Sequence, residues 1–321
     1  MQLNVNNANE IDATAKKWSG CWPLRARMAV INLKVSRSGL AAAALLFNAF
    51  TWGVSWWPFR QLQAQGLHPL WATAVIYLLA VIALTCWRPA AWRELLGAPA
   101  LWVLVAAAGT TNATFNWAVT IGDVVRVVLL FYLMPLWTVL LAWLLLGERP
   151  SALALLRMLL ALAGAAVVLW PPDGGMPLPR TLAEGLGVLG GISFALNNVM
   201  LRREAGRSGT ARALAMFSGG AVVAGALAWA LGAQGAVPGP PMPALGWVAG
   251  VTAMGVLFLI GNLALQYGAA HLPANATAVV LITEVLFASA SAVALGASVL
   301  SPPLVLGGAL IIFAALLAAR G

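Results

Sequence analysis

The sequence predicts an all-α membrane protein of ten transmembrane helices, arranged as two inverted five-helix repeats. Three observations support this prediction. The chain of 321 residues is 62% hydrophobic and only 8% charged, which excludes an ordinary soluble domain. The apolar residues gather into ten runs of 17 to 23 residues, and a helix needs about 20 residues to cross a hydrocarbon core. The two halves of the chain also share short sequence patterns.

The ten predicted spans are helices because, in lipid, each segment must satisfy its own backbone polar groups. They cover residues 40–59, 69–87, 99–121, 124–146, 152–170, 182–200, 211–231, 245–266, 274–295 and 303–319. Residues 1–39 are expected to form a disordered cytoplasmic leader. The domains that follow are a first repeat, an extracytoplasmic linker and a second repeat, at residues 40–170, 171–181 and 182–321.

The basic residues predict the orientation of these spans. Fourteen Lys and Arg residues fall in the leader, in connections on the same side as the N-terminus or at the C-terminal end, and only Arg60, Arg126 and Arg180 fall on the other side. Cytoplasmic loops carry such an excess. We therefore expect a multi-pass protein of the bacterial inner (plasma) membrane with both termini cytoplasmic. The positive charges are scattered over short loops, which argues against a nucleic-acid partner.

The motifs of several enzyme classes are missing from the sequence. It has no GxxxxGK[ST] phosphate-binding loop, no GxSxG serine and no Cys/His cluster. Its two cysteines and two histidines lie far apart. The sequence therefore predicts no catalytic residue, no metal site and no cofactor, and hence a protein that is not an enzyme.

A repeat is visible in the segments LMPLWTVLLAWLLLGERPS (133–151) and LITEVLFASASAVALGASVLS (281–301). Aligning Gly147 with Gly296 places Glu284 at the position of Pro135. A second pair of segments, WGVSWWPFR (52–60) and FALNNVMLR (194–202), aligns Ser55 with Asn197. Because five spans precede the second set, that set is inserted upside down. Inverted repeats of this kind are typical of secondary transporters, which bind substrate near the bilayer midplane between the repeats.

The chain also resembles a known family. The pattern Pro-Leu-Trp-Thr through Leu-Gly-Glu-Arg between Pro135 and Arg149, the Trp52-Gly53 pair and the ten-span layout are similar to the drug/metabolite transporter superfamily, EamA type, and within it to exporters of aromatic amino acids. The resemblance implies export of amino acids, including aromatic ones, or of similar small metabolites by alternating access. The second half departs from the family pattern, since Thr283-Glu284 stands where Glu-Pro is common and Ala297 replaces an acid.

Polar and aromatic residues inside the spans are the candidate substrate-binding residues. Several of them recur at helical spacing and so share one face of a span. The alternative is that such groups join helices by hydrogen bonds worth about 0.6 to 2 kcal/mol each. As a set they favour a polar cavity. The candidates are Asn48, Thr51, Trp52, Ser55, Thr111, Thr114, Phe115, Tyr132, Ser193, Asn197, Asn262, Gln266 and Glu284.

Glu284 and Pro135 mark the centre of this candidate site. A carboxylate in mid-membrane costs roughly 3 kcal/mol unless it lines a wet cavity, is paired or is protonated. Glu284 could therefore donate a hydrogen bond as a neutral acid, pair with a substrate ammonium group or carry a proton. Pro135 is expected to break or hinge its span, because a proline leaves the carbonyl four residues earlier, here that of Phe131, without its donor.

The expected partners are a small-molecule substrate and the lipid bilayer. A transporter for a different solute, such as a drug, a nucleobase or a sugar derivative, is the main alternative. The sequence gives weaker support for a channel, since no ring of charge or filter-like repeat is present. Support is weakest for an intramembrane enzyme.

Overall fold

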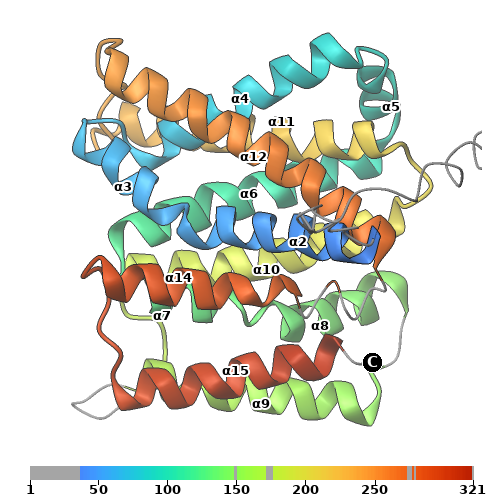
Figure 1. The fold of residues 1–321 in the computed structure, drawn as a ribbon, viewed down its shortest axis with the longest axis vertical. Helices are drawn as coiled ribbons and strands as arrows, with labels where there is room; N and C mark the ends of the chain where they lie inside the picture. Colours follow the sequence, from blue (N-terminus) through green and yellow to red (C-terminus); the bar gives the residue numbers. More distant parts are fainter. Residues whose placement is uncertain (1–36, 148–149, 171–175, 273–276, 278–279, 320–321) are drawn as a thin grey trace, which may run out of the picture. The chain divides into compact units, whose positions relative to one another are not determined.

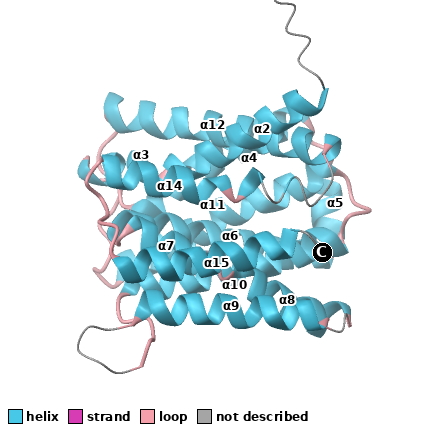
Figure 2. Cartoon of the chain, turned by 60° about the horizontal axis from the view of Figure 1, so that its bottom comes forward, coloured by secondary structure: helices cyan, strands magenta, loops and turns pink. Residues whose placement is uncertain are grey.

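A computed structural model describes residues 37–147, 150–170, 176–272, 277 and 280–319. Within these ranges the fold is entirely helical, as the sequence predicted (Figures 1 and 2). Residues 1–36 of the expected leader and residues 171–175 of the expected linker lie outside the described residues. The first described helix begins at Arg37. Residues 37–39 therefore belong to a helix rather than to the leader.

Most helices follow the predicted spans, although part of the predicted span 274–295 lies outside the described residues. Those up to residue 170 are α2 (Arg37–Val54), α3 (Trp56–Ala64), α4 (Pro69–Trp87), α5 (Ala91–Gly97), α6 (Pro99–Ile121), α7 (Val124–Phe131), α8 (Met134–Leu146) and α9 (Ala152–Leu169). Those after it are α10 (Leu182–Arg203), α11 (Gly209–Ala233), α12 (Leu245–His271), α14 (Thr283–Ala294) and α15 (Pro302–Ala319). The short helix α5 was not predicted.

The lengths and apolar composition of these helices establish a multi-pass membrane protein. Seven stretches in the described part of the chain are long and apolar enough to cross a membrane, and α2 with α3, like α7 with α8, counts as one such stretch. The pair α5 and α6, bent by 100°, raises the number to eight. The apolar parts of α14 and α15 are shorter, at 283–294 and 302–317.

Two of the spans are interrupted four residues before a proline. Helix α2 ends at Val54, before Pro58, and α7 ends at Phe131, before Pro135. A proline has no N–H to give to the carbonyl four residues earlier, and its ring collides with that carbonyl. Each break therefore has a local cause that the sequence alone carries.

A third break, at Ile282, repeats the one before α8 without a proline. The N–H of Val285 donates to the carbonyl of Ile282 at 3.1 Å, just as the N–H of Leu136 donates to that of Leu133 at 3.0 Å. The hydroxyl of Thr283 donates a hydrogen bond to the carbonyl of Val280 at 2.6 Å. Glu284 consequently lies in the first turn of α14 rather than in the middle of a continuous helix.

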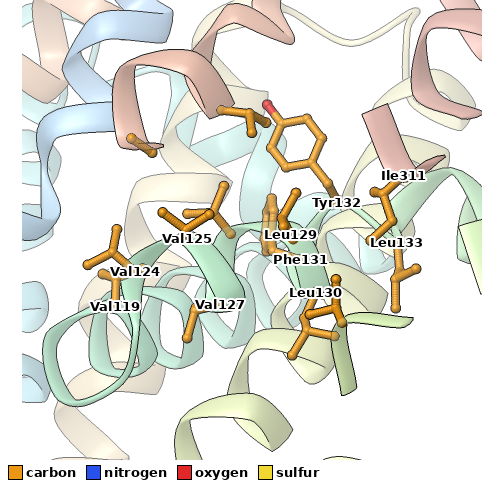
Figure 3. Packing of buried hydrophobic residues seen from close by; sticks show 14 of the residues in the cluster. Val119, Val124, Val125, Val127, Leu129, Leu130, Phe131, Tyr132, Leu133 and Ile311 are labelled. Atoms are coloured by element: carbon orange, nitrogen blue, oxygen red, sulfur yellow. The ribbon is translucent and has the colours of Figure 1, made fainter. Parts of the chain in front are cut away.

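Helices from the two predicted repeats pack against each other throughout the described fold. Helix α10 packs along α6, and α12 packs along α2. Helix α11 packs along α4, and α15 lies beside α9, as Figure 1 shows. A buried apolar cluster surrounds α7, where Val125, Leu129 and Leu133 lie in the same cluster as Ile311 of α15 (Figure 3).

Close approach of main chain to main chain explains two glycines in this packing. A Cβ on Gly191 of α10 would lie 2.6 Å from the carbonyl oxygen of Phe131, which is the carbonyl freed by Pro135. A Cβ on Gly53 of α2 would lie 2.7 Å from the carbonyl oxygen of Glu284. Real Cβ atoms do not approach so closely, so the break at Phe131 and the break before α14 each pack against a glycine in the first helix of the other half.

Candidate functional site: a central cavity

A cavity lies where helices from both halves meet. Its volume is about 160 Å³, which at about 30 Å³ per water is room for roughly five water molecules and therefore for a small solute. It is lined by Asn48, Trp52, Tyr77, Ala108, Thr111, Asn112, Phe115, Phe131, Tyr132, Met134, Phe194, Asn197, Met216, Phe217, Phe258, Asn262, Leu265, Leu281 and Glu284.

The cavity brings together eight of the residues that the sequence singled out. These are Asn48, Trp52, Thr111, Phe115, Tyr132, Asn197, Asn262 and Glu284. The other candidates, Thr51, Ser55, Thr114, Ser193, Gln266 and Pro135, do not line it.

Most of these exceptions form hydrogen bonds within their own helices. The hydroxyls of Thr51, Ser55 and Thr114 donate to main-chain carbonyls three or four residues earlier, at 2.8 Å in each case. The side chain of Gln266 is exposed and donates to Asn262 at 2.7 Å. Ser193 is buried in α10 away from the cavity lining. Helical spacing predicted a shared face for these groups, but it could not predict this use of their polar atoms.

Aromatic residues that the sequence analysis did not select form much of the wall. Trp52 stacks on Phe258 with a centroid distance of 4.6 Å and an interplanar angle of 21°. Phe131 lies against Phe115 at 4.7 Å and against Phe194 at 5.3 Å. The repeat could have indicated one of these residues, Phe194, because the alignment of Ser55 with Asn197 also aligns Trp52 with Phe194.

Most side-chain donors in the cavity wall are already engaged. The amide nitrogen of Asn48 donates to the carbonyl of Gly261 at 3.0 Å. The hydroxyl of Thr111 donates to its own helix at Ala107, and the amide nitrogen of Asn112 does so at Ala108. The hydroxyl of Tyr77 donates to the side-chain oxygen of Asn112. Two of these bonds join helices at the cavity, α2 with α12 and α4 with α6.

Two acceptor groups in the wall stand out against these engaged donors. The side-chain oxygen of Asn197 has no hydrogen-bond partner among the described residues, although the residue is only 2% exposed. Glu284 is half-buried, and the hydroxyl of Tyr132 lies 3.3 Å from its Oε2. The first turn of a helix favours negative charge. The break before α14 therefore gives a local reason for an acid at this depth.

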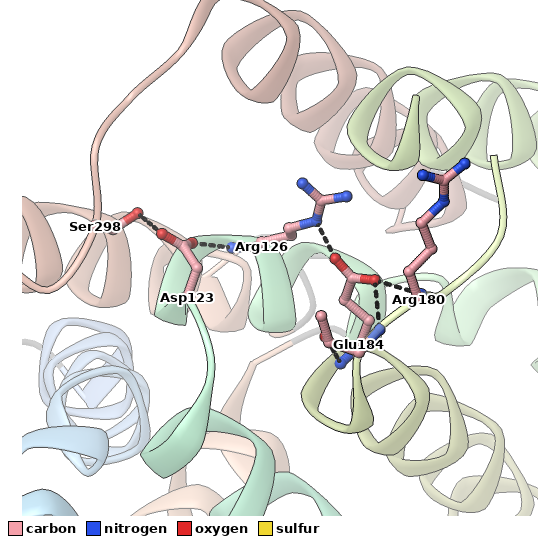
Figure 4. Close-up of polar contacts among 6 residues, drawn as sticks. Asp123, Arg126, Arg180, Glu184 and Ser298 are labelled. Atoms are coloured by element: carbon pink, nitrogen blue, oxygen red, sulfur yellow. Dashed lines mark hydrogen bonds and ion pairs between the residues drawn. The ribbon is translucent and has the colours of Figure 1, made fainter. Parts of the chain in front are cut away.

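A second polar cluster joins the ends of several spans and was not predicted (Figure 4). Asp123 caps α7 and accepts a hydrogen bond from the Ser298 hydroxyl at 2.6 Å. The Nε of Arg126 lies 2.6 Å from Oε1 of Glu184. Glu184 also forms a capping box with Thr181 at the start of α10. In the sequence, Arg126 indicated only the orientation of the chain.

The described residues include no group of three or more His, Cys, Asp or Glu side chains that could hold a metal ion.

The match with known proteins concerns the first predicted repeat. Residues 39–170 match the EamA-like transporter family. Over these residues the chain is similar to that family. The match supports the resemblance seen in the sequence, while the narrower likeness to exporters of aromatic amino acids stays a prediction.

A curated relative and a solved structure add to this family match. An uncharacterized transporter of Pseudomonas aeruginosa is 38% identical to this chain over 98 residues, which are 29% of this chain and 33% of the relative. The match thus spans about a third of the relative's length. The names of the family and of the relative both describe transporters. A crystal structure of another protein shares the fold, with a TM-score of 0.52 at 18% identity over 88% of this chain and 97% of the other.

Proposed function

We propose that the protein is a secondary transporter that exports small amphipathic metabolites, foremost amino acids including aromatic ones, by alternating access. The observation that carries this proposal is the cavity between the two halves. Its aromatic and aliphatic walls suit a side chain, and its amide groups and single acid suit a polar head group. Ligand sites commonly combine an apolar lining with a few placed polar groups.

Ten spans in two inverted repeats are part of this proposal. The seven candidate spans, the bent pair α5 and α6, and the shorter helices α14 and α15 together make ten. The family match ends at residue 170, which is the proposed end of the first repeat, residues 40–170. Residues 171–181 would then be the linker, and residues 182–321 the second repeat.

The packing and the helix ends support this internal symmetry. In the proposed repeat, α2 corresponds to α10, α6 to α12, α4 to α11 and α9 to α15. If the two halves are exchanged, the contact of α6 with α10 therefore becomes the contact of α12 with α2, and both contacts are present. The contacts of α4 with α11 and of α9 with α15 are each exchanged with themselves. The breaks at Leu133 and Ile282 are equivalent positions when Gly147 is aligned with Gly296. Both glycines end their helices in the left-handed region, at φ 72° and 67°, which L-residues with a Cβ avoid.

We also propose that both termini are cytoplasmic, in the inner membrane of a bacterium. A hydrogen bond at 3.2 Å from the N–H of Ser208 to Glu94 places α5 beside the turn between α10 and α11. Basic residues gather around this turn, at Arg93, Arg202, Arg203, Arg207 and Arg212. Such an excess is typical of the cytoplasmic side. The bacterial relative supports the choice of membrane.

Transport by purified protein in sealed vesicles tests the proposed function. We expect saturable movement of labelled phenylalanine, and at least about a tenfold loss in Trp52→Ala and Asn197→Ala, because each truncation removes a group from the cavity wall. Trp229→Ala is the matched control, since Trp229 is 71% exposed and does not line the cavity. Wild-type transport rate and affinity in both cavity variants would contradict the proposal.

A different small solute is the alternative within the same mechanism. The aromatic walls would also accept a nucleobase or a planar drug. Competition by such compounds in the phenylalanine assay separates the two possibilities, because a compound that competes at lower concentration than any amino acid would be the better candidate substrate. A flux that does not saturate would indicate a channel instead.

A further inference from the structure

We propose that helix α7 is a gate between the central cavity and a second pocket on the proposed extracytoplasmic side, and that two polar contacts at its start hold this gate closed. The inference rests on the proposed alternating access, because it names the segment that moves when the cavity opens outward. It follows from the position of the second pocket, from the packing of α7 on α10 and from the contacts at the start of α7.

The second pocket lies at the start of α7 and has a volume of about 450 Å³. It is lined by Ile121, Gly122, Asp123, Arg126, Val127, Thr181, Leu182, Ala183 and Glu184. Val127 of α7 lines this pocket, and Phe131 of the same helix lines the central cavity. These two residues are about one helical turn apart. Along α7, a single turn therefore separates the two spaces.

The seam between α7 and α10 runs from the second pocket toward the central cavity. Glu184, Gly187 and Gly191 share one face of α10 by their helical spacing. A Cβ on Gly187 would lie 3.2 Å from the carbonyl oxygen of Val127, and a Cβ on Gly191 would lie 2.6 Å from that of Phe131. Because neither glycine has a side chain that interlocks with α7, the two helices can separate along this seam without unlocking side chains there.

Helix α7 can move separately from α8. It begins after its N-cap, Asp123, and ends at Phe131, before the break that Pro135 causes. Hinges are short stretches at the ends of elements that absorb changes in backbone dihedral angles. The side chains from Val127 to Phe131 are all apolar. Moving this part of α7 away from its neighbours therefore breaks no side-chain hydrogen bond.

Two polar contacts, which we call the latches, hold the start of α7 (Figure 4). The Nε of Arg126 lies 2.6 Å from Oε1 of Glu184 on α10. The Ser298 hydroxyl, in the turn between α14 and α15, donates to Oδ2 of Asp123 at 2.6 Å. Both latches join the start of α7 to the second half of the chain. The Arg126 side chain is 34% exposed, and an ion pair of this kind is weak enough to break in each transport cycle.

The reactivity of a cysteine in the cavity tests the first latch. Thr111→Cys places a thiol in the cavity lining, in a background without the native cysteines. An impermeant methanethiosulfonate reagent is added outside intact cells and, separately, to inverted membrane vesicles. Glu184→Gln removes the charge of the first latch, and we expect it to raise the reaction rate from outside about two- to fivefold. This is the shift in population that follows the loss of an exposed ion pair.

Two controls distinguish opening of the gate from misfolding. Glu204→Gln should leave the reaction rate unchanged, because the ion pairs of Glu204 are with its chain neighbours Arg203 and Arg207. Ser218→Cys replaces Thr111→Cys in the second control, since Ser218 is buried in α11 and does not line the cavity. This thiol should stay unreactive when Glu184→Gln is added.

Cross-linking the second latch tests the gate in the opposite direction. Asp123→Cys and Ser298→Cys together place two thiols where the side-chain oxygens lie 2.6 Å apart, and a short bis-methanethiosulfonate can join them. We expect the cross-link to slow vesicle transport of labelled phenylalanine at least about tenfold, because a gate that cannot open blocks the cycle. A reductant should restore transport. Each single cysteine variant, treated in the same way, is the control.

The outcomes separate the gate from the proposed function. An unchanged reaction rate from both faces in Glu184→Gln would overturn the gate. Full phenylalanine transport by the cross-linked protein would overturn it while leaving the proposed function standing. A faster cysteine reaction in a protein that moves no amino acid would support the gate and contradict amino acid export. A faster reaction in inverted vesicles alone would support the gate and reverse the proposed orientation.

Discussion

The hydroxyl of Tyr132 lies 3.3 Å from Oε2 of Glu284 and also 3.3 Å from the carbonyl oxygen of Leu281. Tyr132 stands at the break between α7 and α8, and Leu281 and Glu284 flank the break before α14. One hydroxyl therefore joins the two interrupted spans, which come from different halves of the chain. All three residues also line the cavity, so the same contact belongs to the fold and to the candidate site.

Tyr132→Phe tests this contact with the ring left in place. The variant should lose roughly 1–3 kcal/mol of stability, since two acceptors lose a donor, and it should transport more slowly. Thermal unfolding and vesicle transport would measure the two effects. Tyr267→Phe is the control, because Tyr267 does not line the cavity. Equal stability of Tyr132→Phe and wild type would show that the hydroxyl contributes little to holding the breaks together.

Helix α10 offers a test position, Gly191, and a control position, Gly185. A Cβ on Gly191 would meet the carbonyl oxygen of Phe131 at 2.6 Å, whereas a Cβ on Gly185 would have nothing within 4 Å. Gly191→Ala should therefore cost about 1–3 kcal/mol through overpacking. Gly185→Ala should be neutral or stabilising by up to about 1 kcal/mol, because glycine weakens a helix. A similar melting temperature for the two variants would count against the close packing of α10 on the break at Phe131.

Single cysteines test the proposed orientation. Gly206 and Gly239 are exposed, and a Cβ on either would have nothing within 4 Å, so Gly206→Cys and Gly239→Cys should fold normally. In a background without Cys21 and Cys86, an impermeant maleimide added outside intact cells should label position 239 and spare position 206. The reverse labelling would mean that the orientation is opposite to the one proposed.

Two variants of Glu184 distinguish the contribution of its ion pair to stability from that of its helix cap. Its partner Arg126 has a side chain that is 34% exposed, so Glu184→Gln, which keeps the capping hydrogen bond, should cost less than about 1 kcal/mol. Glu184→Ala also loses the cap with Thr181 and should cost roughly 1–2 kcal/mol. Chemical unfolding of the two variants measures the difference. Equal losses of unfolding free energy in the two variants would show that the cap contributes nothing measurable to stability.

Much of the helical layout could be predicted because its causes are local. The spans 69–87 and 99–121 coincide with α4 and α6, since an apolar run that opens with a proline defines both the helix and its start. The break at Phe131 also follows from Pro135 alone. Helix α5 was missed because its seven residues carry no membrane-length apolar signal.

The candidate site could be predicted only in part. Helical spacing placed Asn48 and Thr51 together, but Asn48 reaches across to Gly261 of α12, whereas Thr51 bonds within its own helix. That choice depends on which carbonyl lies nearest in three dimensions. The helix is also interrupted at Ser55, whose hydroxyl donates to the carbonyl of Trp52 and does not line the cavity.

The sequence by itself determined the membrane class, the helix positions and two of the breaks, because hydrophobic length and proline act over a few neighbouring residues. Only the tertiary structure decided what surrounds Glu284. Its partner Tyr132 lies 152 residues away along the chain, and the ring of Phe258 reaches Trp52 from another helix. Such contacts arise when separate helices pack, so no local pattern encodes them. The same packing leaves the side-chain oxygen of Asn197 without a donor among the described residues.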